Sequence, residues 1–327
     1  MSSKEHIIKR GLEEVIRDEE LKSVLSRDKL VCYVGYEPTE RIHVGWLVWI
    51  LKLKDIQKAG IDIKILEATI HAWINDKGSI EELEEYKKNV RKIIEKLGIY
   101  ATYIDSSEII TDPEYVRLLI QAAKNTTLDR VKRAIVVLKR RIEEVEQDFS
   151  KILYPLMQAV DAIYLNVDFA LGSIDQKPAY TMSRDIAVRL GRKPVIILCT
   201  PLIPGLKAPL LEDIDNLDEV LVYAKMSSSR PDDAIFLDDD PETVERKIMS
   251  CPCKPKETLL NPILSIVKHV ILPYYEKITI ETKTKNVEIT IDNAEEIDRL
   301  YRSGELTPEE LKKACKDYLI EMLEKLK

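Results

Sequence analysis

A lysine followed by serines forms the segment of this chain whose residue types are best suited to chemistry. The segment 222–237 (VYAKMSSSRPDDAIFL) carries Lys225 and three consecutive serines before Pro231. Short hydroxyl side chains compete with the backbone for hydrogen bonds and proline cannot continue a helix, so we expect a loop here. A cation on such a loop can close over an anionic ligand. The alternative is a polar linker in which the lysine has no function, and most loops of this composition are linkers of that kind.

A second group of candidate residues consists of His43 and Gly45. They follow an apolar run, 30–36 (LVCYVGY), and belong to the helix-like stretch 43–60. In an open α/β sheet, phosphates bind where the carboxyl end of a strand meets the start of a helix. Gly45 would let a phosphate or a flat base approach the backbone, and His43 could donate a hydrogen bond to a phosphate oxygen. A packing glycine beside an ordinary histidine is the alternative, but together with the Lys225 loop the pair indicates a triphosphate site.

Polar residues also share one face of an otherwise apolar helix-like segment. Tyr154, Gln158 and Asp161 are spaced i, i+4 and i+7 among Ile, Leu, Met and Ala, so they lie on the same side of a helix. A strand is expected next, and Asp175 and Gln176 come just beyond its end. Polar groups on an apolar helix face indicate a pocket, whereas a solvated polar stripe is the alternative.

The elements that would position these residues alternate between strand and helix, which predicts a parallel sheet wrapped by helices. The expected strands are 30–36, 61–72, 99–105, 166–172 and 194–201. The expected helices are 43–60, 80–98, 114–124, 128–147, 148–165 and 184–191, and the charged residues 1–20 are helix-like as well. After Pro241 the pattern changes to helices 242–250, 262–272, 293–301 and 307–326, with a hairpin at 277–291. The last helix would have Thr307 as its N-cap and Pro308 in its first position, and we place a domain boundary near residue 240.

The composition limits the class of protein. The chain has 327 residues, 45% of them hydrophobic, which is enough for two domains. No apolar run reaches about eighteen residues and the N-terminus does not look like a signal peptide, so we expect a cytoplasmic protein that does not enter a membrane. Five cysteines fit a reducing compartment, and Cys251 with Cys253 lacks the further ligands of a zinc site. The net charge of −7 argues against indiscriminate nucleic-acid binding, although a local basic stripe can exist on such a chain.

Several segments resemble the class I aminoacyl-tRNA synthetases. HVGW (43–46) and KMSSS (225–229) are similar to the two signature motifs of those enzymes. The resemblance extends to the tyrosyl-tRNA synthetases of archaea and eukaryotes through YVGYEPT (33–39), HAWIND (71–76), YPLMQAVD (154–161) and DFALGSIDQK (168–177). It spans nearly the whole chain. It implies a Rossmann-like catalytic domain, 1–240, a smaller and mostly helical anticodon-binding domain, 241–327, and a homodimer.

The resemblance implies that tyrosine attacks the α-phosphate of ATP, which arrives with Mg²⁺, and that the tyrosyl group then passes to tRNA(Tyr). The residues that it assigns to catalysis are His43, Lys225, Ser227 and Ser228. Those assigned to tyrosine binding are Tyr33, Tyr154, Gln158, Asp161 and Gln176. Those assigned to ATP binding are Gly35, His43, Gly45, Gly172, Asp175, Lys225 and Met226. Those assigned to tRNA are Arg133, in the basic segment 124–141, and Glu310, and no residue is assigned to a metal.

By the same resemblance, Asp161 and Tyr33 bind the phenolic hydroxyl of tyrosine, and His71 ends the second strand facing the same cleft. Phenylalanine would leave the two hydroxyl-binding groups buried without a partner, which accounts for selectivity. A tryptophanyl enzyme is the nearest alternative, but an indole offers a donor and no acceptor. A nucleotidyltransferase would leave residues 241–327 without a purpose. A non-catalytic relative that binds RNA or protein would have no need of the Lys225 loop.

The chain departs from the family pattern at several positions. Trp46 stands where the first signature usually ends in histidine, and Ser228 stands where many members have a second lysine. Thr69 replaces a common aspartate, which leaves part of the recognition of the tyrosine ammonium group open. Ser173 replaces a glycine, and Lys177 replaces an arginine.

Overall fold

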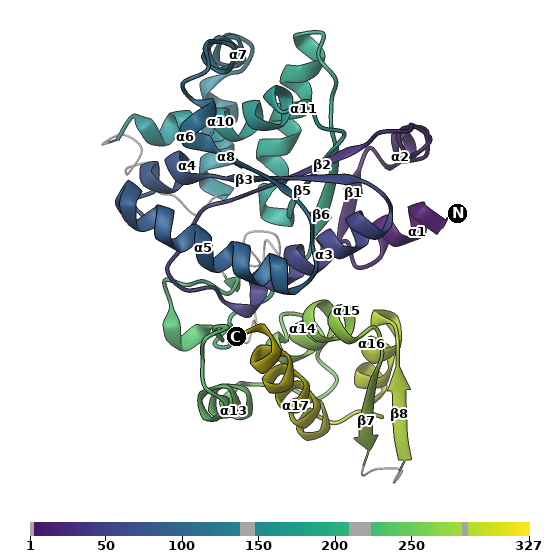
Figure 1. Ribbon diagram of the computed structural model, residues 1–327. Helices are drawn as coiled ribbons and strands as arrows, with labels where there is room; N and C mark the ends of the chain where they lie inside the picture. The colour runs from purple at the N-terminus through teal and green to yellow at the C-terminus, as the bar shows by residue number, and fades with distance from the viewer. Residues whose placement is uncertain (1–2, 138–147, 209–223, 283–286) are drawn as a thin grey trace. The chain divides into compact units, whose positions relative to one another are not determined.

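The computed structural model describes residues 3–137, 148–208, 224–282 and 287–327, which belong to two compact units (Figure 1). The first unit comprises Met1–Glu40 and Leu53–Thr200, and the second comprises Arg41–Lys52 and Pro201–Lys327. The chain therefore passes from the first unit to the second at residue 200. The segment Arg41–Lys52 belongs to the second unit, although it lies between two parts of the first unit in the sequence. The domain boundary near residue 240, expected from the change of pattern after Pro241, stays a prediction.

A six-stranded sheet forms the centre of the first unit, with the strand order β1-β6-β5-β2-β3-β4. The strands are β1 (Glu14–Ile16), β2 (Val31–Tyr36), β3 (Asp62–Glu67), β4 (Thr102–Asp105), β5 (Phe169–Ser173) and β6 (Ile196–Thr200). Neighbouring strands are parallel except β1, which runs antiparallel to β6. The central strands consist almost wholly of buried residues, as expected for a parallel sheet covered on both faces. The predicted α/β class is confirmed.

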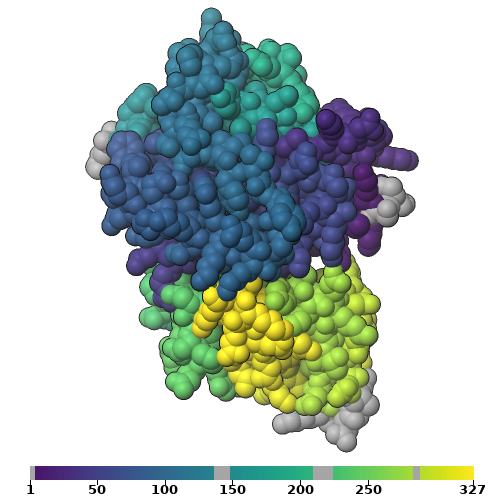
Figure 2. All heavy atoms as spheres, viewed as in Figure 1, coloured from purple at the N-terminus to yellow at the C-terminus, as the bar shows by residue number. Residues whose placement is uncertain are grey.

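Helices cover both faces of this sheet. Figure 1 shows α7, α10 and α11 on one face and α5 on the other, and Figure 2 shows the residues of α5, in blue, at the surface of the molecule. The helices of this unit are α1 (Ser3–Lys9), α2 (Asp18–Leu25), α4 (Thr69–Ile74), α5 (Ile80–Lys96), α6 (Ser106–Ile109), α7 (Pro113–Lys124), α8 (Leu128–Val137), α10 (Ser150–Tyr164) and α11 (Lys177–Arg189). Helix α3 (Leu47–Lys58) begins in the second unit and ends in the first. None of the helices in the described ranges is long and apolar enough to cross a membrane.

Two features of the sheet differ from the sequence-based expectation. The strand expected over 61–72 ends at Glu67, because Glu67 pairs with the last residues of its neighbours, Tyr36 and Asp105, and no ladder partner follows. His71 therefore lies in helix α4 and does not end a strand, which corrects that prediction. Strand β1 was not expected within the charged N-terminal residues, because three residues are too few to show a hydrophobic period.

The second unit is mostly helical, as expected. Its helices are α13 (Pro241–Ser250), α14 (Pro262–Ile266), α15 (Leu272–Tyr275), α16 (Ala294–Ser303) and α17 (Pro308–Leu326). The predicted hairpin is confirmed as β7 (Ile278–Thr282) and β8 (Val287–Ile291), in which every second residue of β7 is buried. The predicted start of α17 is confirmed too, since Thr307 caps the helix and Pro308 is its first residue.

A buried ion pair holds the carboxyl ends of β3 and β4 beneath helix α4. Lys87 of α5 pairs with the carboxylate of Asp105, and Thr69 Oγ1 donates to the same carboxylate at 2.9 Å. Burial alone would raise the pKa of Asp105, but hydrogen bonds from Lys87, Ser107 and Thr69 outweigh burial and lower that pKa. Thr69 is thus committed to Asp105, so the hydroxyl in place of the common aspartate serves to attach α4 to β4.

We expect Asp105→Asn to destabilise the protein by about 3 kcal/mol at pH 7, because Lys87 loses the nearest of its carboxylate partners and keeps only Glu84 at 2.6 Å and Glu67 at 4.0 Å. Since the folded pKa of Asp105 is lowered, its contribution is present above the unfolded pKa, about 4, and is lost as the pH falls through the folded value. Urea unfolding at pH 7 and pH 3 should therefore show a smaller loss on acidification in the variant than in the wild type. Asp62→Asn, at the exposed start of β3, is the matched control and should change the unfolding free energy by less than about 0.5 kcal/mol. Equal acid sensitivity of wild type and Asp105→Asn would contradict the assignment.

Candidate active site

A buried carboxylate, Asp161, lies at the centre of the polar residues predicted from the sequence. Its side chain projects from α10 with 1% exposure. The hydroxyl of Tyr115, from α7, donates to Asp161 Oδ1 at 2.7 Å. His71 Nε2, from α4, lies 3.2 Å from Asp161 Oδ2, although neither ring nitrogen of His71 forms a hydrogen bond within the described residues. Each oxygen of the carboxylate is therefore flanked by a polar group from a different helix.

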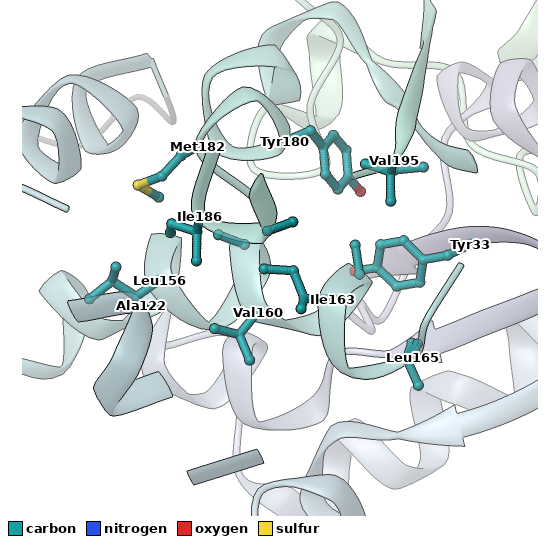
Figure 3. Packing of buried hydrophobic residues seen from close by; sticks show 14 of the residues in the cluster. Tyr33, Ala122, Leu156, Val160, Ile163, Leu165, Tyr180, Met182, Ile186 and Val195 are labelled. Carbon is teal, nitrogen blue, oxygen red and sulfur yellow. The ribbon is translucent and has the colours of Figure 1, made fainter. Parts of the chain in front are cut away.

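Tyr33 of β2 reaches the same buried cluster. It is 1% exposed, and its ring meets the ring of Tyr180 edge-on, with centroids 6.2 Å apart. Figure 3 shows both tyrosines on the same side of the hydrophobic core. Burial first, and then the neighbouring Tyr180 and the negative charge of Asp161, raise the pKa of Tyr33 well above its usual value. Tyr33 therefore keeps its hydroxyl proton, and the charge of Asp161 acts on that hydroxyl.

Two glycines make room for these aromatic rings. A Cβ atom on Gly35 would lie 2.7 Å from the hydroxyl of Tyr33, since residues i and i+2 of a strand face the same side. A Cβ atom on Gly172 would lie 2.6 Å from Cε2 of Tyr180. The structure thus gives Gly35 and Gly172 a packing function that the sequence analysis did not foresee. Their contact with ATP stays a prediction.

The three polar residues of α10 are all buried, so the solvated stripe considered from the sequence is wrong. Gln158 Nε2 donates to Gln176 Oε1 at 2.9 Å, while Gln158 Oε1 is buried without a hydrogen-bond partner in the described parts of the chain. The Tyr154 ring stands edge-on to the His71 ring at 5.3 Å. A buried amide oxygen without a partner is costly, so Gln158 marks a place where a ligand with N–H groups would be stabilised.

Asp175 is also buried, at 2% exposure, in the short turn between β5 and α11. Ser173 Oγ donates to its carboxylate. The serine found in place of the family's glycine therefore orients the carboxylate that the sequence analysis assigned to ATP.

In the second unit, His43 has a defined orientation. Its Nδ1 accepts a hydrogen bond from the backbone N–H of Gly45 at 3.2 Å, so the neutral ring carries its proton on Nε2 and can donate from there. A Cβ atom on Gly45 would lie 2.9 Å from the His43 ring. Glycine therefore permits the ring to lie against the backbone of residue 45. His43 also pairs with Phe236 in an antiparallel bridge.

The serine-rich loop belongs to the same compact unit as His43. Ser228 Oγ donates to the carbonyl oxygen of Arg41 at 3.1 Å, and the backbone N–H of Met226 donates to Ile203 at 2.8 Å. Arg230 donates to the carbonyl oxygen of Lys225 at 2.6 Å. Met226 is 3% exposed, so it anchors the loop through packing. These contacts join the KMSSS loop to Arg41, two residues before His43; a joint triphosphate site of His43 and Lys225 stays a prediction.

Ser227 lies on the outer part of this loop, where its hydroxyl is 2.9 Å from the hydroxyl of Ser229. The residues that follow the loop pack beside the His43 segment, because the N–H of Leu237 donates to Ile42 and the N–H of Val44 donates to Ile235. The histidine and the lysine loop are therefore fixed in one unit, whereas Tyr33 and Asp161 lie in the other.

The family of the chain follows from comparison with known proteins. Residues 25–324 match the model of the class I tRNA synthetases for tryptophan and tyrosine (W and Y). The chain belongs to this family. The predicted class I synthetase resemblance is thereby confirmed.

Individual relatives are similar over almost their full length. A tyrosine–tRNA ligase of Pyrobaculum aerophilum is 42% identical over 97% of this chain and 98% of its own. The crystal structure of a tyrosyl-tRNA synthetase from Archaeoglobus fulgidus, in complex with L-tyrosine, has a TM-score of 0.88 and 36% identity, covering 99% of this chain and 98% of its own. The crystal structure of the enzyme from Aeropyrum pernix has a TM-score of 0.87 and 35% identity, covering 99% and 92%. The synthetase fold is thus established.

The residues predicted to contact tRNA lie in different surroundings. Arg133 lies on α8 and lines a depression of about 510 Å³ on this synthetase together with Thr126, Thr127, Arg130, Lys177, Pro178, Thr181 and Arg189. Glu310 is 7% exposed and forms a capping box with Thr307 at the start of α17, so it has a structural function in addition to the predicted one. Residues 138–141 of the predicted basic segment lie outside the described residues. Both tRNA assignments stay predictions.

The sequence analysis missed Tyr115 and Tyr180. Tyr115 shares the buried face of α7 with Leu118 and Ala122, a spacing that indicates an ordinary core position. The partner of its hydroxyl, Asp161, is distant in the sequence, so no local pattern announces the contact. The one signal in the sequence is a tyrosine on the apolar face of a helix, close to the Asp112 cap at the start of that helix.

We expect Gly35→Ala to lower the unfolding free energy by about 1–3 kcal/mol, because the added methyl group collides with the Tyr33 hydroxyl. The double variant Gly35→Ala/Tyr33→Phe lacks that hydroxyl and should recover at least half of the loss, as measured by urea unfolding. If the double variant is as unstable as the sum of the two single variants, the clash is not the cause.

Proposed function

We propose that the protein is a tyrosine–tRNA ligase that activates tyrosine with ATP and transfers the tyrosyl group to tRNA(Tyr). The observation that carries the proposal is the buried Asp161 carboxylate, whose charge acts on the equally buried Tyr33 hydroxyl. Membership of the synthetase family supports the reaction type, and relatives named tyrosine–tRNA ligases support the amino acid.

The phenolic hydroxyl of tyrosine fits this pair because it can donate to Asp161 and accept from Tyr33. A carboxylate has lone pairs for several donors, so Asp161 can accept from the substrate while it accepts from Tyr115. Phenylalanine would leave a buried charge and a buried hydroxyl without that partner. An indole N–H would satisfy the carboxylate but not the Tyr33 donor, which disfavours tryptophan.

The amino group of the substrate has its own candidate partners. Gln158 Oε1 lacks a hydrogen-bond partner within the described ranges, and it can accept from the ammonium group. Gln176 and Tyr154 border it, through a hydrogen bond to Gln158 and through the same face of α10. These groups take the place of the aspartate that relatives commonly carry at the position of Thr69, whose hydroxyl is engaged by Asp105.

In the first chemical step, a carboxylate oxygen of tyrosine forms a bond to the α-phosphorus of ATP, and the bond from that phosphorus to pyrophosphate breaks. His43 donates from Nε2 to the developing negative charge, and Lys225 with Ser227 and Ser228 stabilises the departing pyrophosphate, which leaves with its Mg²⁺. In the second step a ribose hydroxyl of the tRNA attacks the tyrosyl carbonyl carbon and AMP departs. Positioning and charge stabilisation are sufficient for both steps, so no covalent enzyme nucleophile is required.

The remaining assignments complete the proposal. Gly35, Gly172 and Asp175 contact the adenosine, and Gly45 and Met226 form part of the triphosphate site. Arg133 contacts the acceptor end of the tRNA, and Glu310 reads its anticodon from the domain that begins near residue 241. The enzyme acts as a homodimer in the cytoplasm.

Exchange of labelled pyrophosphate into ATP tests the function directly. With tyrosine, phenylalanine and tryptophan assayed side by side and without tRNA, we expect exchange with tyrosine alone. Strong exchange with tryptophan would replace the tyrosine assignment, and absence of exchange with all three would overturn the proposed activity.

His43→Gln should reduce the rate constant of tyrosine-dependent exchange by about 100-fold, because a positioned donor to the transition state is lost. Equilibrium binding of tyrosine, which lies at the Asp161 cluster, should change by less than twofold. His6→Gln, at an exposed position of α1, is the matched control and should behave like the wild type. A loss of tyrosine binding equal to the loss of rate would contradict the assignment of His43 to the phosphate chemistry.

A further inference from the structure

We propose that Tyr115 is a positioning residue that holds the Asp161 carboxylate in the orientation that selects tyrosine. The proposal rests on the proposed function, because it concerns selection between tyrosine and phenylalanine. Tyr115 does not have to touch the substrate. Its hydroxyl donates to Asp161 Oδ1 at 2.7 Å, and it acts through that hydrogen bond.

The contact is well suited to fixing a carboxylate. Tyr115 and Asp161 are each 1% exposed, so water does not compete for the hydrogen bond. Burial first, and then the charge of Asp161, raise the pKa of Tyr115 far above its usual value, so the hydroxyl keeps its proton. Hydrogen bonds to charged acceptors are shorter and stronger than neutral ones. The bond therefore restrains rotation of the carboxylate about its side-chain torsion.

The position of Tyr115 is itself fixed by a second tyrosine–aspartate contact between the same two helices. Tyr164 of α10 donates to Asp112 Oδ2 at 2.6 Å, and Asp112 is the N-cap of α7. The rings of Tyr115 and Tyr164 meet edge-on with centroids 5.4 Å apart. Helices α7 and α10 thus exchange two hydrogen bonds in opposite directions, of which one ends on the selective carboxylate and the other does not.

The two contacts make it possible to distinguish a positioning function of the Tyr115 hydroxyl from a function in packing alone. If Tyr115 only packed the interface between α7 and α10, removal of its hydroxyl would weaken the use of tyrosine and phenylalanine equally. If it orients Asp161, the loss falls on the amino acid that carries a phenolic hydroxyl. The ratio of the two specificity constants therefore measures the proposed role.

The experiment compares Tyr115→Phe with Tyr164→Phe, the matched control that removes the hydroxyl at the other contact. Specificity constants for tyrosine and phenylalanine are measured by pyrophosphate exchange, with thermal unfolding recorded in parallel. We expect Tyr115→Phe to reduce the tyrosine-to-phenylalanine ratio by about tenfold or more, the size of one lost charge-assisted hydrogen bond, mainly through a higher KM for tyrosine. The phenylalanine value should change by less than twofold, and Tyr164→Phe should keep the wild-type ratio.

An unchanged ratio in Tyr115→Phe, or an equal loss for both amino acids, would overturn the positioning role while leaving the proposed function intact. In an Asp161→Asn background the same substitution should change the ratio by less than twofold, since no carboxylate remains to be held; a further large drop would contradict the proposal.

Tyr115→Met, which also lacks the donor, is the second variant if Tyr115→Phe does not fold, with the same expected ratio. A wild-type protein that does not exchange with tyrosine would overturn the proposed function and, with it, this inference.

Discussion

The Asp161 carboxylate must keep its charge in a part of the molecule that water does not reach, and the surrounding fold provides for this requirement. A buried charge is costly unless hydrogen-bond donors surround it. Here the polar groups around the carboxylate come from separate elements: Tyr115 of α7 donates to Asp161 Oδ1, His71 Nε2 of α4 lies 3.2 Å from Oδ2, and the charge of Asp161 acts on the buried Tyr33 of β2. Bringing them to one point requires the doubly covered parallel sheet, because the strands and helices that carry them are remote from one another in sequence.

Other features of the first unit serve the same constraint. Gly35 leaves the space that the Tyr33 hydroxyl needs, and the Lys87–Asp105 pair attaches the start of α4, which carries His71. In the proposed function, the second unit presents a hydrogen-bond donor, His43, and a cation, Lys225, to the phosphates. It does so by folding His43 back onto Gly45 and by tying the Lys225 loop to Arg41 and Ile203. The residues that we propose for amino-acid selection and those that we propose for phosphate binding thus lie in separate units of the chain.

Much of the fold could be predicted because many of its elements follow from the periodicity of residues within one segment. The spacing of Tyr154, Gln158 and Asp161 is a property of one helix, and the alternating hairpin and the Thr307 cap are equally local. The predictions were wrong or incomplete where a residue distant in the sequence determines the end of a strand or the partner of a side chain. The end of β3 at Glu67 depends on where β2 and β4 end, and the hydrogen bond from Tyr115 to Asp161 joins residues that are 46 positions apart in the sequence. The residue types at those positions carry no local signal of such contacts.

The central claim, that the charge on Asp161 selects the substrate, is tested most directly by equilibrium binding without ATP. Isothermal titration should give a lower Kd for L-tyrosine than for L-phenylalanine with the wild type. In Asp161→Asn, which keeps the shape of the side chain and removes its charge, the account predicts that this preference falls by about tenfold or more while the affinity for phenylalanine does not decrease. A variant that retains the full preference for tyrosine would show that selection rests on other groups and would contradict the account.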